Sequence, residues 1–261
     1  MRYFVLRDYC VQLAWVVLEK QAGKKYSVRL TDTPSDILAA QKLRHLAFGL
    51  SAPSGIDADN FDPVCTHVLV EEQKTNCLVC CYRLLHLNGG LEIEKSYSAQ
   101  HYELSALQSY SGKLVEMGRF CIHPEVKDPD VLRMAWAELA KYVDQEGVEL
   151  LFGCASFQGT DTADYLDAFA MLRDKYLAPK RWLPRVKSPT VFRFAARLRR
   201  KPDMRQALRR MPPLLRSYLM MGGWVSDHAV VDSQLNTLHV FTGIEIRSMP
   251  AARKRLLRAL S

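Results

Sequence analysis

The sequence predicts an α/β fold built on one large sheet. The chain has 261 residues, 48% of them hydrophobic, so it can bury a sizeable core. Several apolar stretches are bounded by Gly, Pro, Asn or Asp, as β-strands commonly are. Between two such stretches, Leu114–Pro124 and Leu150–Phe157, the segment Val131–Glu146 carries apolar residues at helical spacing and is followed by Gly147. This order predicts a βαβ crossover.

The chain before this crossover predicts strands, helices and one long loop. We expect a strand at Tyr26–Leu30 and a helix that starts at Thr33 and ends at Phe48. The segment Ser51–Pro63 is rich in Gly, Pro, Asp and Asn and predicts a loop, and loops of this length are often functional. The other elements expected here are a strand at Thr66–Glu71, a turn at Gln73–Asn76, a strand at Cys77–His86 and a short helix at Ser98–Leu107.

The chain after the crossover predicts a basic helical insertion and two closing strands. The expected elements are a helix at Asp161–Tyr176, a Pro-punctuated basic stretch at 179–213, a helix at Leu214–Met221, and strands at Trp224–Val231 and Thr237–Ile246. We therefore divide the chain into an N-terminal amphipathic helix (residues 1–24), a domain (25–246) and a basic amphipathic tail (247–261). The insertion occupies about residues 160–222 of that domain.

Two charges interrupt the predicted strand Leu114–Pro124. Glu116 and Arg119 lie in an apolar run, and charges are seldom buried without partners, so this strand is expected to pass a cleft. A spacing of three places two residues on opposite faces of a regular strand. An extra residue in a β-bulge at Gly118 would bring both charges to one face and splay the strand. Arg83, in the middle of another predicted strand, likewise indicates a cleft or a buried ion pair.

The net charge of +8 favours an acidic partner: nucleic acid, anionic lipid or an acidic carrier protein. Seven basic residues and one acid occupy Arg197–Arg210, but no aromatic residues interleave with them and no nucleic-acid-binding motif is present, so nucleic acid is not expected. The seven cysteines, odd in number and irregularly spaced, predict reduced thiols in a cytoplasmic protein. Cys77 and Cys80 have no second ligand pair, so no metal site is expected.

The sequence predicts no membrane span, because no apolar run reaches roughly 18 residues. The apolar start of the chain lacks the cleavage site of a signal peptide and predicts an amphipathic helix that packs on the domain or lies on a membrane. The segment Pro250–Leu260 places arginines and a lysine beside leucines. Such a basic amphipathic helix suits an anionic membrane surface, and a solvated terminal helix is the alternative.

A set of motifs in a fixed order resembles a known family. These motifs are Leu43–Phe48, Asp59–Asp62, Cys65–His67, Tyr82–Leu85, Glu116–Pro124, Leu151–Phe157, Pro212–Leu215 and Val231–Asp232. Together they resemble the bacterial ornithine–acyl carrier protein N-acyltransferases, which make lyso-ornithine lipid and belong to the GCN5-related N-acetyltransferase (GNAT) superfamily. The resemblance covers Tyr26 to Ile246 and implies a mixed, mostly antiparallel sheet with a splayed central strand and flanking helices.

The chain is more distantly similar to the acyl-homoserine lactone synthases, which also take acyl groups from acyl carrier protein. The positions that match the pattern of those enzymes are Arg44 and Phe48, Asp59 and Asp62, Arg83, and Glu116, Arg119 and Phe120. We take the first five of these as candidate substrate-binding residues, and Glu116 with Arg119 as the candidate catalytic residues.

The main resemblance implies transfer of a (3-hydroxy)fatty acyl group from acyl carrier protein to the α-amine of ornithine. The product would be lyso-ornithine lipid, the first intermediate of ornithine lipid synthesis. It implies a cytoplasmic enzyme that is peripherally associated with the inner membrane and uses no cofactor. The alternatives are a glutamine-lipid or other N-acyl amino acid synthase, and an acyl-homoserine lactone synthase, which would need S-adenosylmethionine.

The predicted loop after the strand Leu114–Pro124 bears on the acyl donor. In most of the superfamily this loop is glycine-rich and cradles the coenzyme A pyrophosphate, whereas here the segment Pro124–Asp130 has no glycine. That departure favours the single phosphate of a phosphopantetheine arm on acyl carrier protein, with acyl-coenzyme A as the alternative. We expect a helix N-terminus with Lys127 or Arg133 to hold the phosphate. We expect Phe120, Cys121 and Ile122 to lie along the arm.

The chemistry requires a group that deprotonates the attacking amine. A carboxylate in a partly buried cleft gains a raised pKa and can take that proton, which makes Glu116 the candidate base. The alternative is a structural ion pair of Glu116 with Arg119 or Arg83. Cys121 could act as a nucleophile but fits a small buried side chain better, and His123 has no evident partner in the sequence.

Recognition of the acceptor requires two kinds of contact. The α-carboxylate calls for an arginine, and the candidates are Arg83 and Arg119. The distal amine of ornithine calls for acids, and the candidates are Asp59 and Asp62; alternatively, these acids order the loop and pair with the arginines. A glutamine acceptor would need amide-matching groups instead, and the sequence leaves the acceptor open.

Overall fold

The computed structural model describes residues 25–51 and 53–259, with side chains as far as residue 255. The helix predicted for residues 1–24 lies outside the described residues. The strands are β1 (Tyr26–Thr31), β2 (Thr66–Glu72), β3 (Cys77–Leu87), β4 (Tyr102–Glu103), β5 (Lys113–Ile122), β6 (Val148–Gln158), β7 (Arg185–Val186), β8 (Val191–Phe192), β9 (Trp224–Val225), β10 (Ala229–Asp232) and β11 (Thr237–Glu245). The α-helices are α3 (Pro34–Ala47), α4 (Ser98–His101), α5 (Pro129–Glu146), α6 (Leu166–Lys175), α7 (Phe194–Arg197), α8 (Met204–Arg210), α9 (Pro213–Met220) and α10 (Ala251–Ala259).

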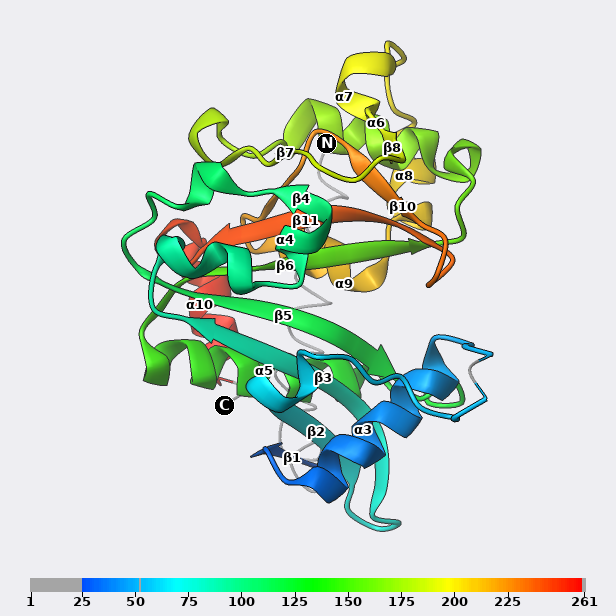
Figure 1. Cartoon of the computed structure of the whole chain (residues 1–261), viewed down its shortest axis with the longest axis vertical. Helices are drawn as coiled ribbons and strands as arrows, with labels where there is room; N and C mark the ends of the chain where they lie inside the picture. Colours follow the sequence, from blue (N-terminus) through cyan, green and yellow to red (C-terminus); the bar gives the residue numbers. More distant parts are fainter. Residues whose placement is uncertain (1–24, 52, 260–261) are drawn as a thin grey trace, which may run out of the picture.

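One mixed sheet forms the centre of the molecule (Figure 1). Its strands run in the order β1-β2-β3-β5-β6-β11-β10-β8, and β9 pairs with β11. Neighbouring strands are antiparallel except for β5 and β6, which are parallel. Because α5 joins these two parallel neighbours, the predicted βαβ crossover is confirmed, as is the mostly antiparallel α/β fold.

Helices cover both faces of the sheet (Figure 1). On one face, Ala40 and Leu43 of α3 pack against Leu69, Cys81 and Cys121. On the other face, α5 and α9 share a large apolar core with the alternate residues of β2, β3 and β5. Period-two alternation of the strands separates the two cores. Helices α6, α7 and α8 gather at the end of the sheet that carries β8.

The start and end of α3 and α5 follow from local sequence. Thr33 caps α3, since its side chain accepts a hydrogen bond from the Asp36 N–H, and a proline occupies the first helical position. Asp128 caps α5 in the same way, and Gly147 ends it with the positive φ of 65° that favours glycine. The expected helix boundaries here are correct to within a few residues.

Two sequence-based expectations about secondary structure are wrong. The helix expected at Ser98–Leu107 ends at His101, because the next two residues are extended and pair with β7. The strand expected at Trp224–Val231 is broken into β9 and β10 by Ser226, whose Oγ accepts a hydrogen bond from the Phe241 N–H. The side chain of this serine takes the place of a main-chain carbonyl as the acceptor between the two strands.

Candidate active site

The two parallel strands at the centre of the sheet separate beside a cavity. Residues Lys113–Glu116 of β5 pair with Val148–Phe152 of β6, and the two strands do not pair beyond that point. From there on, β5 remains paired with β3 and β6 remains paired with β11. At the point of separation, a Cβ on Gly153 would lie 2.4 Å from the Met117 carbonyl oxygen, so only glycine allows this approach. The cavity next to the opening has a volume of about 280 Å³.

A β-bulge in β5 turns both predicted catalytic residues toward the same side. Cys121 pairs with Cys81 and Gly118 pairs with Arg83, so two residues of β5 lie opposite one residue of β3. The bulge expected at Gly118 therefore exists but lies one residue further on, at Arg119, whose φ is 55°. Glu116 and Arg119 both meet Tyr97: the carboxylate accepts its N–H, and the guanidinium lies 4.9 Å from the centre of its ring.

Glu116 is buried at the edge of the cavity and is held by the start of α4. Its carboxylate accepts hydrogen bonds from the Tyr97 N–H at 2.8 Å, the Ser98 N–H at 2.7 Å and the Ser98 Oγ at 2.5 Å. Burial raises the pKa of Glu116, and these donors partly offset that rise. Among the described residues, neither arginine pairs directly with this carboxylate, so the ion pair considered as the alternative is not formed.

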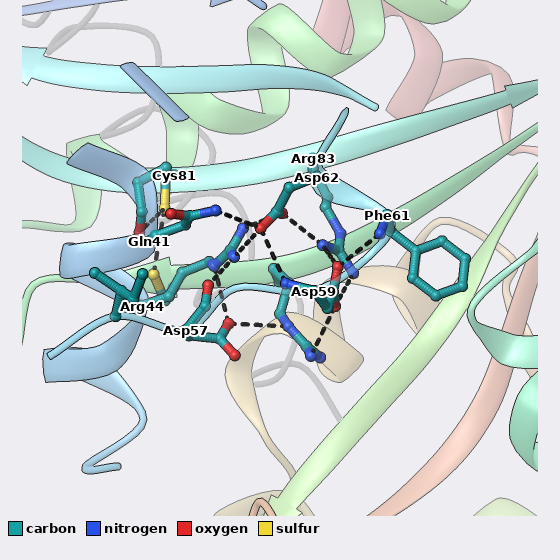
Figure 2. A network of polar contacts seen from close by, with 12 residues as sticks. Gln41, Arg44, Asp57, Asp59, Phe61, Asp62, Cys81 and Arg83 are labelled. Atoms are coloured by element: carbon teal, nitrogen blue, oxygen red, sulfur yellow. Dashed lines mark hydrogen bonds and ion pairs between the residues drawn. The ribbon is translucent and has the colours of Figure 1, made fainter. Parts of the chain in front are cut away.

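Three arginines and three aspartates form a buried network beside Glu116 (Figure 2). Arg44, which is 1% exposed, donates to both carboxylate oxygens of Asp62 at 2.8 Å. Its Nε lies 2.9 Å from an Asp57 carboxylate oxygen. With every charge partnered inside the protein, Arg44 and Asp62 fix the loop that follows α3 against the sheet.

Arg83 and Arg119 both pair with Asp59, the third aspartate of the network. Arg83 donates to Asp59 at 2.5 and 2.8 Å, and Arg119 donates to the same carboxylate at 3.0 Å. Burial would raise the pKa of Asp59, but its hydrogen bonds to Arg83, together with the charges of Arg83 and Arg119, leave the pKa lowered. The side chain of Arg83 is 3% exposed and that of Arg119 is 12% exposed, so Arg119 is the more accessible guanidinium.

The cavity brings together some of the predicted site residues and omits others. Those that line it are Phe48, Arg83, Glu116, Arg119 and Phe120. Those that do not line it are Arg44, Asp59, Asp62, Cys121, Ile122, Lys127 and Arg133. Residues of the lining that were not among the sequence-based candidates include Tyr97, Cys154, Ser156, Tyr218, Asp232 and His239. The signal for Asp232 was present in the sequence, since Val231–Asp232 is one of the family-like motifs.

The end of β5 turns main-chain groups toward the side from which β6 has separated. His123 donates its N–H to the Val79 carbonyl of β3, so the alternation of the ladder turns the main-chain groups of Phe120 and Ile122 toward the separated β6. Cys121 faces the opposite way, with its Sγ 3.5 Å from that of Cys81. The contact with Cys81 and burial raise the pKa of Cys121 well above its usual value, which disfavours a thiolate nucleophile.

The start of α5 has internal partners for its polar groups. The Asp128 carboxylate accepts the Asp130 N–H at 3.0 Å, and Pro129 has no N–H to offer. Arg133 pairs with Asp130. Two acids at this helix end reduce its attraction for a phosphate, and Lys127 remains the exposed cation of the adjoining loop.

The sheet opens beside a cavity that holds a buried carboxylate, and part of the chain that forms this site matches an acyltransferase family model. Residues 44–137 match the family model described as "Acetyltransferase (GNAT) domain". An N-acyl amino acid synthase from uncultured soil microbes is 10% identical, with a TM-score of 0.49 over 86% of this chain and 92% of that protein.

Curated relatives identify the family more narrowly. The L-ornithine N(alpha)-acyltransferase of Rhodobacter capsulatus is 34% identical over 242 residues, which cover 87% of this chain and 93% of the relative. The enzyme of the same name from Brucella abortus is 29% identical over 82% of each chain. The chain belongs to the L-ornithine Nα-acyltransferase family.

Three further observations bear on what the molecule binds. The described residues contain no group of three or more His, Cys, Asp or Glu side chains that could hold a metal ion. Among the described helices, none has the length and apolar character to cross a membrane. The basic insertion is partly neutralised: Arg200 pairs with Asp167 at 2.8 Å, while Arg199 and Lys201 stay exposed.

Proposed function

We propose that this enzyme transfers a (3-hydroxy)fatty acyl group from acyl carrier protein to the α-amine of ornithine, forming lyso-ornithine lipid. The shared name of its relatives supports ornithine as the acceptor. The observation that carries the chemistry is the cavity at the separation of β5 and β6, because Glu116, Arg119 and Phe120 of β5 all line it. A thioester and an amine can meet there.

Glu116 is proposed to act as the general base. An ammonium group cannot attack a thioester, so one proton must leave the α-amine first. Burial raises the pKa of Glu116 toward that of the amine, and the carboxylate takes the proton directly or through one water molecule. The Tyr97 and Ser98 donors keep the carboxylate in place during this transfer.

The amine then attacks the thioester carbonyl carbon. A C–N bond forms, the carbonyl oxygen becomes an oxyanion, and the C–S bond breaks as the tetrahedral intermediate collapses. The N–H group of Phe120, a residue that lines the cavity, is turned toward the opening, where it is suited to donate to the oxyanion. The departing phosphopantetheine thiolate takes up a proton, and the second amine proton is released.

Arg119 is proposed to bind the α-carboxylate of the acceptor. It lines the cavity and is more exposed than Arg83, and its contacts to Asp57 and Asp59 use Nε and Nη2. Its Nη1 takes no part in these ion pairs and can donate to a bound carboxylate. The acid network then serves to hold Arg83 and Arg119 in place.

Acyl carrier protein is the proposed donor, and basic side chains are its proposed docking surface. The exposed cations Arg199 and Lys201 of the insertion and Lys127 of the loop after β5 would steer an acidic carrier toward the opening of the sheet. We also propose peripheral contact with an anionic membrane surface, supported by the basic residues of α10.

The test is a donor and acceptor panel followed by mass spectrometry. The purified enzyme is incubated with 3-hydroxyacyl carrier protein or the matching acyl-coenzyme A, together with ornithine, lysine or glutamine. The proposal predicts N-acylornithine as the main product, formed faster from the carrier protein. Acylation of glutamine in preference to ornithine would overturn the acceptor, and equal rates from both donors would overturn the carrier protein as the preferred donor.

A further inference from the structure

The lining of the cavity also carries an acid without a cationic partner. Asp232, at the end of β10, lines the cavity. One of its carboxylate oxygens, Oδ1, accepts the Gln234 and Leu235 N–H groups, each at 3.0 Å. No lysine, arginine or histidine of the described chain lies within ion-pair distance of it. This contrasts with Asp59 and Asp62, whose charges are compensated by arginines.

A histidine next to this acid has an unused nitrogen. His239 of β11 also lines the cavity, is 2% exposed, and has no hydrogen-bond partner at Nε2 among the described residues. The Tyr102 hydroxyl donates to the His239 carbonyl at 2.8 Å, so at 3.3 Å it accepts from Nδ1–H. That arrangement leaves a lone pair on Nε2.

The imidazole remains neutral at physiological pH. Burial lowers the pKa of His239 to about 3, although the charge of Asp232 acts in the opposite direction. A buried nitrogen with a free lone pair requires a hydrogen-bond donor, and the chain itself supplies none there. Because His239 lines the cavity, its Nε2 is placed to accept a hydrogen bond from a ligand bound there.

A row of rings connects this part of the cavity to Glu116. His239 lies 4.9 Å from His101, ring centre to ring centre, and His101 lies 5.0 Å from Tyr97. Tyr97 in turn donates its N–H to Glu116. The base and the unpaired acid also line the same cavity, as an acceptor with two amines would require.

We propose that Asp232 and His239 form a subsite for the distal amine of the acceptor, with the carboxylate pairing with a primary ammonium and Nε2 accepting one of its hydrogens. This inference rests on the proposed function and gives it a specificity. It assigns to Asp232 the role that the sequence suggested for Asp59 and Asp62. A glutamine side chain would leave the carboxylate without a counter-charge, so amino acids with a distal primary amine are preferred.

The test compares ornithine with 2-aminopentanoate, which lacks only the distal amine. Binding of both amino acids is measured by calorimetry, and their kcat/KM values are measured with acyl carrier protein. Asp232→Asn keeps the oxygen that accepts the turn N–H groups. It is expected to weaken ornithine binding and lower its kcat/KM by about 100-fold, while values for 2-aminopentanoate change less than about threefold. Asp161→Asn, which alters a capping acid outside the cavity lining, is the matched control.

A second pair of variants tests the imidazole. His239→Gln retains an acceptor and is expected to keep most of the preference for ornithine, whereas His239→Leu should reduce it by about tenfold. Turnover of 2-aminopentanoate reports that each variant is folded. Equal losses for both amino acids in Asp232→Asn, or no loss for either, would overturn the subsite. Ornithine binding that depends on Asp232, without acyl transfer in the wild type, would refute the proposed function alone.

Discussion

Replacing Arg44 tests whether the buried network is structural. The Arg44→Met variant keeps the length of the side chain but leaves two aspartates with one cation fewer. Arg44 is 1% exposed and makes three short contacts with these acids, so its loss leaves buried charge uncompensated. We expect the free energy of unfolding to fall by about 3–5 kcal/mol.

The matched control is Arg29→Met. Arg29 also contacts two acids, Asp36 and Glu71, but its side chain is 43% exposed. Exposed pairs contribute about 0–1 kcal/mol, so the control should change the free energy of unfolding by less than about 1 kcal/mol. Both variants are measured by urea denaturation at pH 7, where the aspartates are ionised.

The pH dependence of the same experiment has a defined sign. Burial alone would raise the pKa of Asp62, but hydrogen bonds from Arg44 and Gln41 and the charges of Arg44 and Arg83 together lower it in the folded protein. Its stabilisation is therefore complete above the unfolded pKa of about 3.9 and is lost as the pH falls toward the lower folded value. The difference between wild type and Arg44→Met should shrink below about pH 4. Equal destabilisation by Arg44→Met and Arg29→Met at pH 7 would refute the structural role.

Two further predictions concern the opening of the sheet and the donor. Gly153→Ala should lower the free energy of unfolding by about 1–3 kcal/mol, because its Cβ would lie 2.4 Å from a main-chain oxygen of β5. The control Gly118→Ala should lower it little, because the nearest atom to its Cβ would be 3.6 Å away. Equal melting temperatures for the two variants would contradict this prediction. Reversing the charges of the exposed basic cluster should raise the KM for acyl carrier protein at least about tenfold and weaken the salt dependence of kcat/KM, with Lys42→Glu on α3 as control. An unchanged KM would place the docking surface elsewhere. The cluster comprises Arg199, Arg200 and Lys201.

Much of the fold was predictable because local sequence controls it. The capping residues of α3 and α5 and the alternation of apolar residues in the long strands indicate where these elements begin and end. The bulge was predictable from the spacing of Glu116 and Arg119, but its position was not: glycine suggested residue 118, whereas tertiary ion pairs hold Arg119 itself at a positive φ. The broken strand before β10 depended on one serine hydrogen bond that no periodicity reveals.

The site was predictable only where charge interrupted an apolar pattern. Glu116, Arg83 and Arg119 were noticed for that reason. The partners of the three aspartates could not be assigned, because Asp57–Asp62 meets arginines from two strands and one helix only in the folded sheet. Asp232 was not singled out as a site residue, since an acid at the end of a strand resembles ordinary turn chemistry.

The central claim is that Glu116 removes the proton from the attacking amine. The most direct measurement is the single-turnover rate of acyl transfer to ornithine as a function of pH, for wild type, Glu116→Gln and the control Glu138→Gln. The wild-type rate should fall as the pH drops through the raised pKa of Glu116. Glu116→Gln should lower the rate by roughly 10²–10⁴-fold and lose this acidic limb. A folded Glu116→Gln enzyme with the wild-type rate and the same acidic limb would contradict the account.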